Sequence, residues 1–175
     1  WSAFPAYAKK LNKKRENSKY LPGHTIPKRI QITADFDYAF EHSDILIMAV
    51  PTAYIRSILR TRKHFDYSTK IVVNVAKGIE NRTFITPYDI IREQLGTGFP
   101  LAVLSGPSHA EEVARKMPTC VVIASPRQEL NHRLQRIFIS PLFRVYTVTD
   151  VIGVELGAAL KNVVAIAAGM CDGLR

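Results

Sequence analysis

The sequence predicts an α/β protein with a doubly wound, mainly parallel sheet, followed by one long helix. Short runs rich in Val and Ile alternate with helix-like stretches through most of the chain, which is typical of parallel sheets covered by helices. The run 44–50 is apolar on both sides, as expected of a central parallel strand. After Asp150 the alternation stops. We therefore predict a partial α/β domain at 1–149 and the truncated start of a helical domain at 150–175.

Each element is predicted from its own pattern. Runs of β-branched and apolar residues predict strands at 30–33, 45–50, 70–75, 101–105, 119–124 and 143–148. Helical spacing predicts helices between them at 6–15, 36–42, 53–62, 87–95, 110–115 and 127–138. The last segment, 151–174, is apolar and dense in Gly and Ala, and it predicts a single long helix.

Composition and charge narrow the class of protein. The chain has 175 residues, of which 47% are hydrophobic and 22% charged, as in soluble globular proteins with one core. Residues 1–30 hold eight Lys or Arg and one acid, so most of the net charge of +9 lies there. We expect a solvated basic surface and no nucleic-acid partner, because aromatic residues do not interleave with the charges. The longest apolar run, 163–170, is too short for a membrane span.

The cysteines and the first residue give two further expectations. Cys120 and Cys171 have neither the spacing of a zinc site nor that of a disulfide framework, so we predict no metal and a reducing, cytoplasmic location. The chain starts at Trp1 and shows no secretory signal core. We expect it to be an internal fragment of a longer protein.

Three segments follow strands at the edge of the sheet where ligands bind in open parallel sheets. Pro51 ends a buried strand and can start a helix, although an ordinary strand-to-helix turn explains it equally well. Lys77 stands before Gly78 at a strand end, where it either faces a ligand or is simply solvated. Ser108 and Glu111 have the spacing of a capping box, a structural reading that is compatible with ligand binding.

The helix after Asp150 carries a lysine among small residues. Steps of three or four residues place one stripe on its surface, made of Gly153, Gly157, Lys161, Ala165, Ala168 and Asp172. Small side chains leave room for a ligand, and an apolar setting would favour the neutral amine that proton transfer requires. Close helix packing, with the lysine reaching out to solvent, is the alternative.

These segments, in this order and spacing, resemble the NAD(P)-dependent glycerol-3-phosphate dehydrogenases of the bacterial type. The matching segments are 50–51, 75–78, 104–108, 143–146 and, longest and most specific, 150–173. The resemblance spans the whole chain, with Trp1 matching the tryptophan at the end of the family's second strand. It implies a Rossmann-like NAD(P)-binding domain without its first strand and helix, followed by the first helix of an all-helical substrate domain.

The resemblance also implies roles for individual residues. Lys161 would be the general base and contact the substrate, Asn162 would help to orient the substrate, and Lys77 would contact both cofactor and substrate. Gly106 and Ser108 would bind the substrate. Ala110 and Pro51 would contact the cofactor.

By the same resemblance, the reaction is the interconversion of sn-glycerol 3-phosphate and dihydroxyacetone phosphate, with NAD or NADP as cofactor, feeding glycerophospholipid synthesis. The family's GxGxxG turn and its Arg-Asn phosphate-binding pair are not in this sequence, so we expect the chain alone to be inactive. Ala3 replaces a residue near the cofactor's ribose, which leaves the choice between NADH and NADPH open. The oligomeric state is left open, with a homodimer as one alternative.

Two rival functions remain at this stage. One is another two-domain dehydrogenase with a lysine base, acting on hydroxy acids or on 6-phosphogluconate. The other is a non-catalytic, anion-binding module that works through the basic residues of 1–30.

Overall fold

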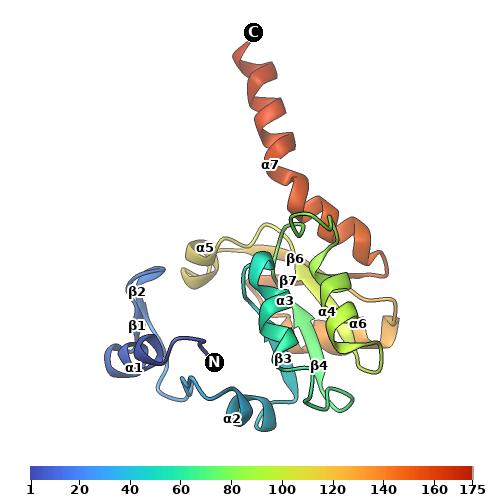
Figure 1. The fold of residues 1–175 in the computed structure, drawn as a ribbon. Coiled ribbons are helices and arrows are strands. Elements are labelled where there is room, and N and C mark those ends of the chain that lie inside the picture. The colour runs from blue at the N-terminus through green and yellow to red at the C-terminus, as the bar shows by residue number, and fades with distance from the viewer. Residues whose placement is uncertain (175) are drawn as a thin grey trace. The chain divides into compact units, whose positions relative to one another are not determined.

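The computed structural model describes residues 1–174 and divides into two compact units (Figure 1). The first unit comprises residues 1–44 and 109–117, and the second comprises residues 45–108 and those from 118 onward. The two units are described separately below.

The first unit is built from short elements. They are α1 (Pro5–Lys14), β1 (Glu16–Asn17), β2 (Leu21–Thr25), α2 (Phe36–Glu41) and α5 (Ala110–Ala114). Pro5 suits the start of α1, because the first turn of a helix does not need its missing N–H. β1 and β2 pair as an antiparallel hairpin, which the sequence did not predict.

The strand predicted at 30–33 is wrong, since these residues form no strand. Their backbone groups bind neighbouring segments instead of a strand. The Asn12 side chain donates to the Ile32 carbonyl at 2.6 Å, and the Ser2 amide donates to the Thr33 carbonyl at 2.9 Å. The apolar residues of 30–33 therefore predicted a strand wrongly. The carbonyls of Ile32 and Thr33 accept from a side chain and from one isolated amide, and not from a neighbouring strand.

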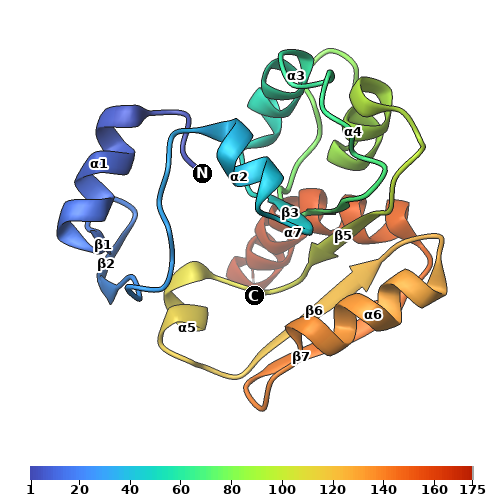
Figure 2. The ribbon, with the colours of Figure 1, turned by 90° about the horizontal axis from the view of Figure 1, so that it is seen from below.

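The second unit contains a five-stranded sheet in the order β3-β4-β5-β6-β7 (Figure 2). Its strands are β3 (Ile45–Met48), β4 (Ile71–Asn74), β5 (Leu101–Ser105), β6 (Thr119–Ala124) and β7 (Phe143–Val148). All neighbours are parallel except β5 and β6, which confirms the mainly parallel sheet. Its helices are α3 (Thr52–Arg60), α4 (Pro87–Leu95), α6 (Gln128–Phe138) and α7 (Val151–Gly173).

Helices cover both faces of this sheet. Val73 packs in a buried cluster with Leu130 and Leu134 of α6. The next residue, Asn74, points to the other face, because side chains alternate along a strand. There it bonds to Glu155 of α7. Helices α6 and α7 therefore lie on opposite faces, as the prediction of a doubly wound sheet requires.

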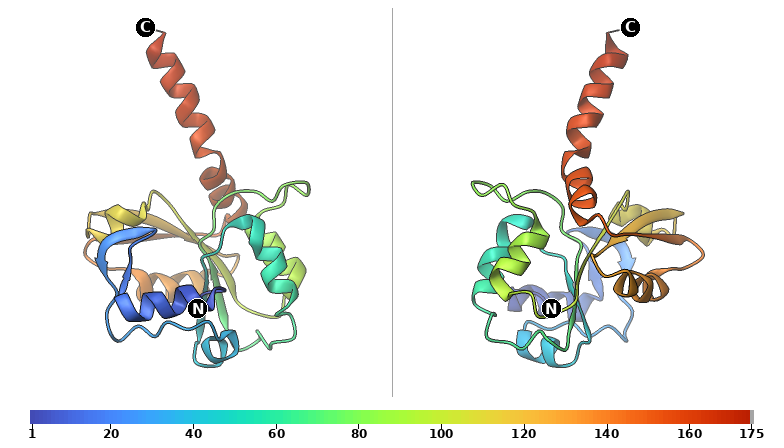
Figure 3. Two further views of the ribbon diagram at one scale, coloured as in Figure 1. Left: turned by 60° about the vertical axis from the view of Figure 1, so that its left-hand side comes forward. Right: turned by 90° about the vertical axis from the view of Figure 1, so that its right-hand side faces the viewer.

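The long helix α7 is anchored at its first two turns. The Asp150 carboxylate caps it by accepting from the Gly153 amide at 2.8 Å. Within residues 151–173 only Val151 and Glu155 are buried, and the outer part extends away from the sheet (Figure 3). The domain boundary predicted at residue 150 stays a prediction, because the base of α7 packs on the sheet of the second unit.

By length and composition α7 could cross a membrane. This is weak evidence, since core helices of soluble proteins meet the same criterion. The expectation that the protein has no membrane span stays a prediction.

Candidate active site

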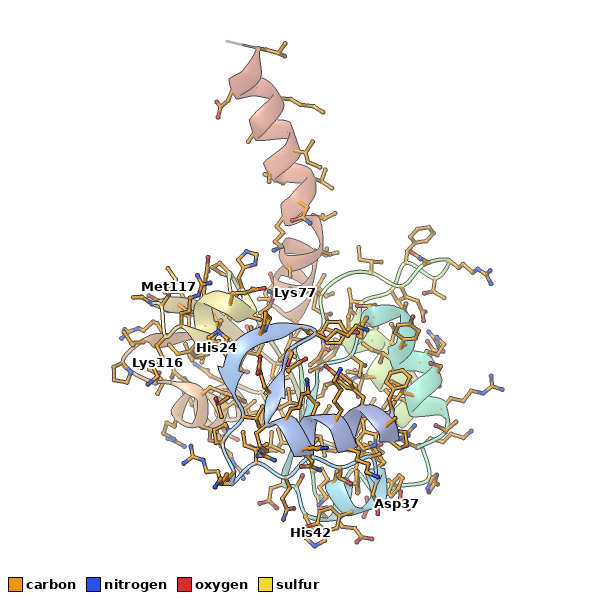
Figure 4. The ribbon with its side chains drawn as sticks, turned by 90° about the vertical axis from the view of Figure 1, so that its left-hand side faces the viewer. His24, Asp37, His42, Lys77, Lys116 and Met117 are labelled. Atoms are coloured by element: carbon orange, nitrogen blue, oxygen red, sulfur yellow. The ribbon has the colours of Figure 1, made fainter. Side chains whose placement is uncertain are left out.

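Lys77 lies just beyond the carboxyl end of β4 and contacts two of the other predicted site residues. Its Nζ donates to the Gly106 carbonyl oxygen at 2.8 Å and lies 3.5 Å from the Ser108 Oγ. Gly106 and Ser108 directly follow β5, the strand beside β4. Figure 4 labels Lys77 near the foot of α7. Two adjacent strand ends thus bring together three of the residues that the sequence singled out.

Buried side chains hold the turn that carries Lys77. Asn74 is fully buried, and its amide group both accepts from the Ala76 N–H at 3.1 Å and donates to the Ala76 carbonyl at 3.2 Å. The Thr52 hydroxyl, at the start of α3, donates to the Lys77 carbonyl at 3.0 Å. Gly78 then turns the chain with φ +119°, a conformation that suits glycine. The Lys77 backbone is therefore fixed from two sides.

The position of the Gly106 carbonyl depends on the absence of a side chain. Gly106 has φ +150°, and a Cβ there would lie 2.7 Å from the Cys120 carbonyl oxygen and 2.9 Å from the Val121 Cα. These are backbone atoms of β6 and cannot move aside easily. Only glycine allows β5 to end this close to β6 with its carbonyl directed at Lys77.

The capping box predicted for Ser108 and Glu111 is wrong. The N-cap of α5 is His109, which makes no side-chain capping bond. The Ser108 hydroxyl instead donates to the Gly106 carbonyl at 3.3 Å and lies beside the Lys77 ammonium. Local competition explains the difference, because a serine hydroxyl bonds readily to a carbonyl two residues back.

Besides Lys77, the two residues predicted to contact the cofactor lie at helix starts. Pro51 is the exposed N-cap of α3, next to Thr52. Ala110 is the exposed first residue of α5 and belongs to the first unit. Their contacts with a cofactor stay predictions.

Lys161 lies close enough to Lys77 for the two charges to interact. Partial burial, and then the positive charge of Lys161, lower the pKa of Lys77 below its usual value. Lys161 and Asn162 are both exposed on α7. The expected apolar surroundings of Lys161 are therefore not formed by the described residues, because α7 has left the sheet by this point of the helix.

Sequence reasoning missed a buried acid at the base of α7. Glu155 is 4% exposed, and its Oε1 accepts from the Tyr88 amide at 2.9 Å and from the Asn74 Nδ2 at 3.4 Å. Burial raises the pKa of Glu155, while hydrogen bonds from Thr86, Tyr88 and Asn74 oppose this shift. The available signal was a charged residue in an otherwise apolar helix turn, six positions before Lys161.

The loop after Lys77 is held by one arginine and two acids. Arg56 of α3 pairs with Glu80 through two hydrogen bonds, at 2.9 Å and 2.8 Å, and also with Glu93 of α4. This pairing lowers the pKa of Glu80 to about 2. Among residues 1–174, no group of three or more His, Cys, Asp or Glu side chains could hold a metal ion.

Comparison with known proteins identifies the family. Residues 1–131 match the family model described as the N-terminus of NAD-dependent glycerol-3-phosphate dehydrogenase, and residues 150–175 match the one described as its C-terminus. The chain belongs to the NAD-dependent glycerol-3-phosphate dehydrogenase family. The loops around Lys77, Gly106 and Ser108 lie in the first matched region, and Lys161 lies in the second.

Individual members of the glycerol-3-phosphate dehydrogenase family agree with this assignment. The enzyme named glycerol-3-phosphate dehydrogenase [NAD(P)+] from Fusobacterium nucleatum is 47% identical over 99% of this chain and 52% of its own length. Its counterpart from Halothermothrix orenii is 45% identical over 94% of the chain and 48% of its own length. The chain thus spans about half the length of the curated relatives it matches.

Solved structures of the family share the fold. The glycerol-3-phosphate dehydrogenase of Coxiella burnetii superimposes with a TM-score of 0.88 at 30% identity, covering 99% of this chain and 53% of that one. The Plasmodium falciparum enzyme gives a TM-score of 0.85 at 30% identity, covering 95% and 47%. The predicted Rossmann-like arrangement followed by a long helix is therefore confirmed.

Proposed function

We propose that the whole protein is an NAD(P)-dependent glycerol-3-phosphate dehydrogenase that interconverts sn-glycerol 3-phosphate and dihydroxyacetone phosphate. One observation carries the proposal. In a chain of this family, the ends of β4 and β5 hold Lys77 against Gly106 and Ser108, within electrostatic reach of Lys161. Ligands of open parallel sheets bind at this edge.

The described residues fit the reacting end of such a ligand. The Lys77 ammonium has three N–H donors and uses two of them, on the Gly106 carbonyl at 2.8 Å and on the Ser108 Oγ at 3.5 Å, so one can still donate to a substrate oxygen. Lys161 is exposed on α7, and its charge acts on Lys77. A bound nicotinamide would accept a hydride from the substrate carbon, or return one to it.

In the oxidative direction, neutral Lys161 takes the hydroxyl proton as the carbon–oxygen double bond forms and the hydride, with its electron pair, leaves the carbon. Lys77 holds the same oxygen and stabilises its partial negative charge. In the reductive direction, protonated Lys161 returns the proton to that oxygen. Asn162 orients the substrate beside Lys161.

The proposal also covers the location of the protein, its metabolic role and its assembly. The protein acts in the cytoplasm and supplies glycerol 3-phosphate, the backbone of glycerophospholipids. Two free cysteines, Cys120 and Cys171, support a reducing compartment. Assembly as a homodimer stays a prediction.

The test uses the full-length protein and compares substrates. We expect reduced cofactor to form with glycerol 3-phosphate, and none with 6-phosphogluconate or simple 2-hydroxy acids. The chain of 175 residues alone is expected to show no turnover, since it spans about half of its relatives. Turnover of a hydroxy acid without turnover of glycerol 3-phosphate would overturn the proposed function.

A further inference from the structure

We propose that Asn74 and Glu155 form a buried link that holds the helix carrying Lys161 in register with the turn carrying Lys77. Both are positioning residues that set the separation of the two lysines. The inference rests on the proposed function, because it assigns the two lysines to one reaction.

The link joins segments that are 81 positions apart in the sequence. Asn74 ends β4 and is 0% exposed, and Glu155 lies in the second turn of α7 and is 4% exposed. The Asn74 Nδ2 donates to the Glu155 Oε1 at 3.4 Å. Polar groups buried to this degree lose their hydration, so their bonds to each other strongly favour one arrangement.

The Asn74 side chain bonds both to the turn that carries Lys77 and to the helix that carries Lys161. Its Oδ1 accepts from the Ala76 amide, and its Nδ2 donates to the Ala76 carbonyl as well as to Glu155. Ala76 directly precedes Lys77. One buried amide therefore shapes the Lys77 turn and holds the base of α7.

Glu155 also fixes a third element. Its Oε1 accepts from the Tyr88 amide at 2.9 Å, in the first turn of α4. The N-cap of α4, Thr86, makes no capping bond of its own. Glu155 thus satisfies an N–H that the helix leaves free, where a carboxylate is favoured by the helix dipole. The base of α7 is consequently attached to both β4 and α4.

Because α7 continues well beyond Glu155, its attachment at Glu155 determines where Lys161 lies. Lys161 lies six residues beyond Glu155, roughly 9 Å along the axis at the rise of an α-helix. Within residues 151–173 only Val151 and Glu155 are buried, so the described chain holds α7 at its base alone. A change in tilt at Glu155 therefore displaces Lys161 relative to Lys77.

The experiment measures steady-state kinetics of the full-length protein with glycerol 3-phosphate. Glu155→Ala and Asn74→Ala are each expected to lower kcat by about 100-fold with a smaller change in KM, because a misplacement of about 1 Å costs that much. The double variant is expected to lose less activity than the product of the two single losses, because the Asn74–Glu155 bond is removed in both single variants.

Glu155→Gln is the conservative control. Its amide oxygen can accept from Tyr88 and Asn74, and the Thr86 hydroxyl, which donates to the Asp89 carboxylate, can accept from the glutamine Nε2. We expect its kcat to stay within about 3-fold of the natural protein, a barrier change of less than about 1 kcal/mol. Glu41→Ala, at an exposed acid at the end of α2, should change nothing.

A pH profile separates positioning from simple stability. The charge of Lys161 lowers the pKa of Lys77, so a wider separation moves the basic limb of kcat/KM to higher pH. Loss of the Glu155 charge by itself would move the limb the other way, and Glu155→Gln isolates that effect. A folded Glu155→Ala variant with natural kcat and the same limb as Glu155→Gln would overturn the inference.

If Glu155→Ala does not fold, a second pair of variants decides. Asn74→Asp places an acceptor against the Glu155 carboxylate and should lower kcat, and adding Glu155→Gln should restore part of it, because the glutamine amide can donate to the new carboxylate. No restoration would overturn the link. These results differ from failure of the proposed function, in which the natural protein itself would not oxidise glycerol 3-phosphate.

Discussion

The turn at Lys77 and the helix segment at Lys161 are held in opposite ways. The Lys77 turn is fixed by side chains from both sides, through Asn74 and Thr52, and its ammonium bonds to Gly106. Lys161 lies on an exposed part of α7, a helix that the described residues hold only at its base. The half of the site proposed to hold the substrate is therefore built into the sheet, whereas the position of the proposed proton-transfer residue depends on the direction of one helix.

The largest effect on stability is expected at the rigid half, from Gly106→Ala. The added Cβ would overlap the Cys120 carbonyl and the Val121 Cα, and the backbone conformation disfavours any side chain. We expect the free energy of unfolding to fall by about 2–4 kcal/mol, with loss of activity, as urea unfolding would measure. Gly98→Ala is the control, since a Cβ there meets nothing within 4 Å. Unchanged stability of Gly106→Ala would show that β5 and β6 can separate freely.

The anchored base of α7 is tested by Asp150→Ala. Removing the carboxylate that accepts from the Gly153 amide should cost about 1 kcal/mol of unfolding free energy. Asp150→Asn is the matched control and should cost less, because asparagine also caps helices well. Equal losses in both variants would mean that the charge matters more than the hydrogen bond.

A comparable but local effect is expected from Thr52→Val. The hydroxyl donates to the Lys77 carbonyl at 3.0 Å in a buried position, so its loss should cost about 0.5–1.5 kcal/mol. Thr52→Ser should keep the bond. If KM for glycerol 3-phosphate rises in Thr52→Val alone, the turn rather than overall stability is affected. An unchanged KM in both would contradict the role given to this bond.

The smallest effect concerns Arg56 and depends on pH. Arg56 holds the pKa of Glu80 at about 2, below its usual value of 4.5, so the stabilisation is present above pH 4.5 and is lost as the pH falls through about 2. Arg56→Ala should therefore lower the unfolding midpoint at neutral pH and lose this difference in acid. A difference that is constant with pH would contradict the ion pair as its cause.

The fold could be predicted where periodicity and turn residues agree. The strands at 101–105, 119–124 and 143–148 and the helix at 87–95 were predicted with their observed bounds. The antiparallel pairing of β5 with β6 could not be predicted, because a strand's pattern does not reveal its direction. The hairpin of β1 and β2 was missed because its residues are mostly polar and do not alternate.

The site was predictable in residue types but not in contacts. Strand-end position singled out Lys77 and the segment with Ser108, whereas Gly106 was named only through the family resemblance. The roles of Asn74 and Glu155 arise from contacts 81 positions apart, which no local pattern contains. The exposure of Lys161 likewise depends on how far α7 follows the sheet, and its apolar sequence suggested more burial than is found.

The central claim, that Lys161 transfers the proton in oxidation of glycerol 3-phosphate, is tested most directly by Lys161→Met in the full-length protein. The control is Lys63→Met, an exposed lysine on the loop after α3. We predict a loss of kcat by about 10²–10⁴-fold for Lys161→Met with an intact fold, and natural activity for Lys63→Met. Equal turnover by the two variants would contradict the account.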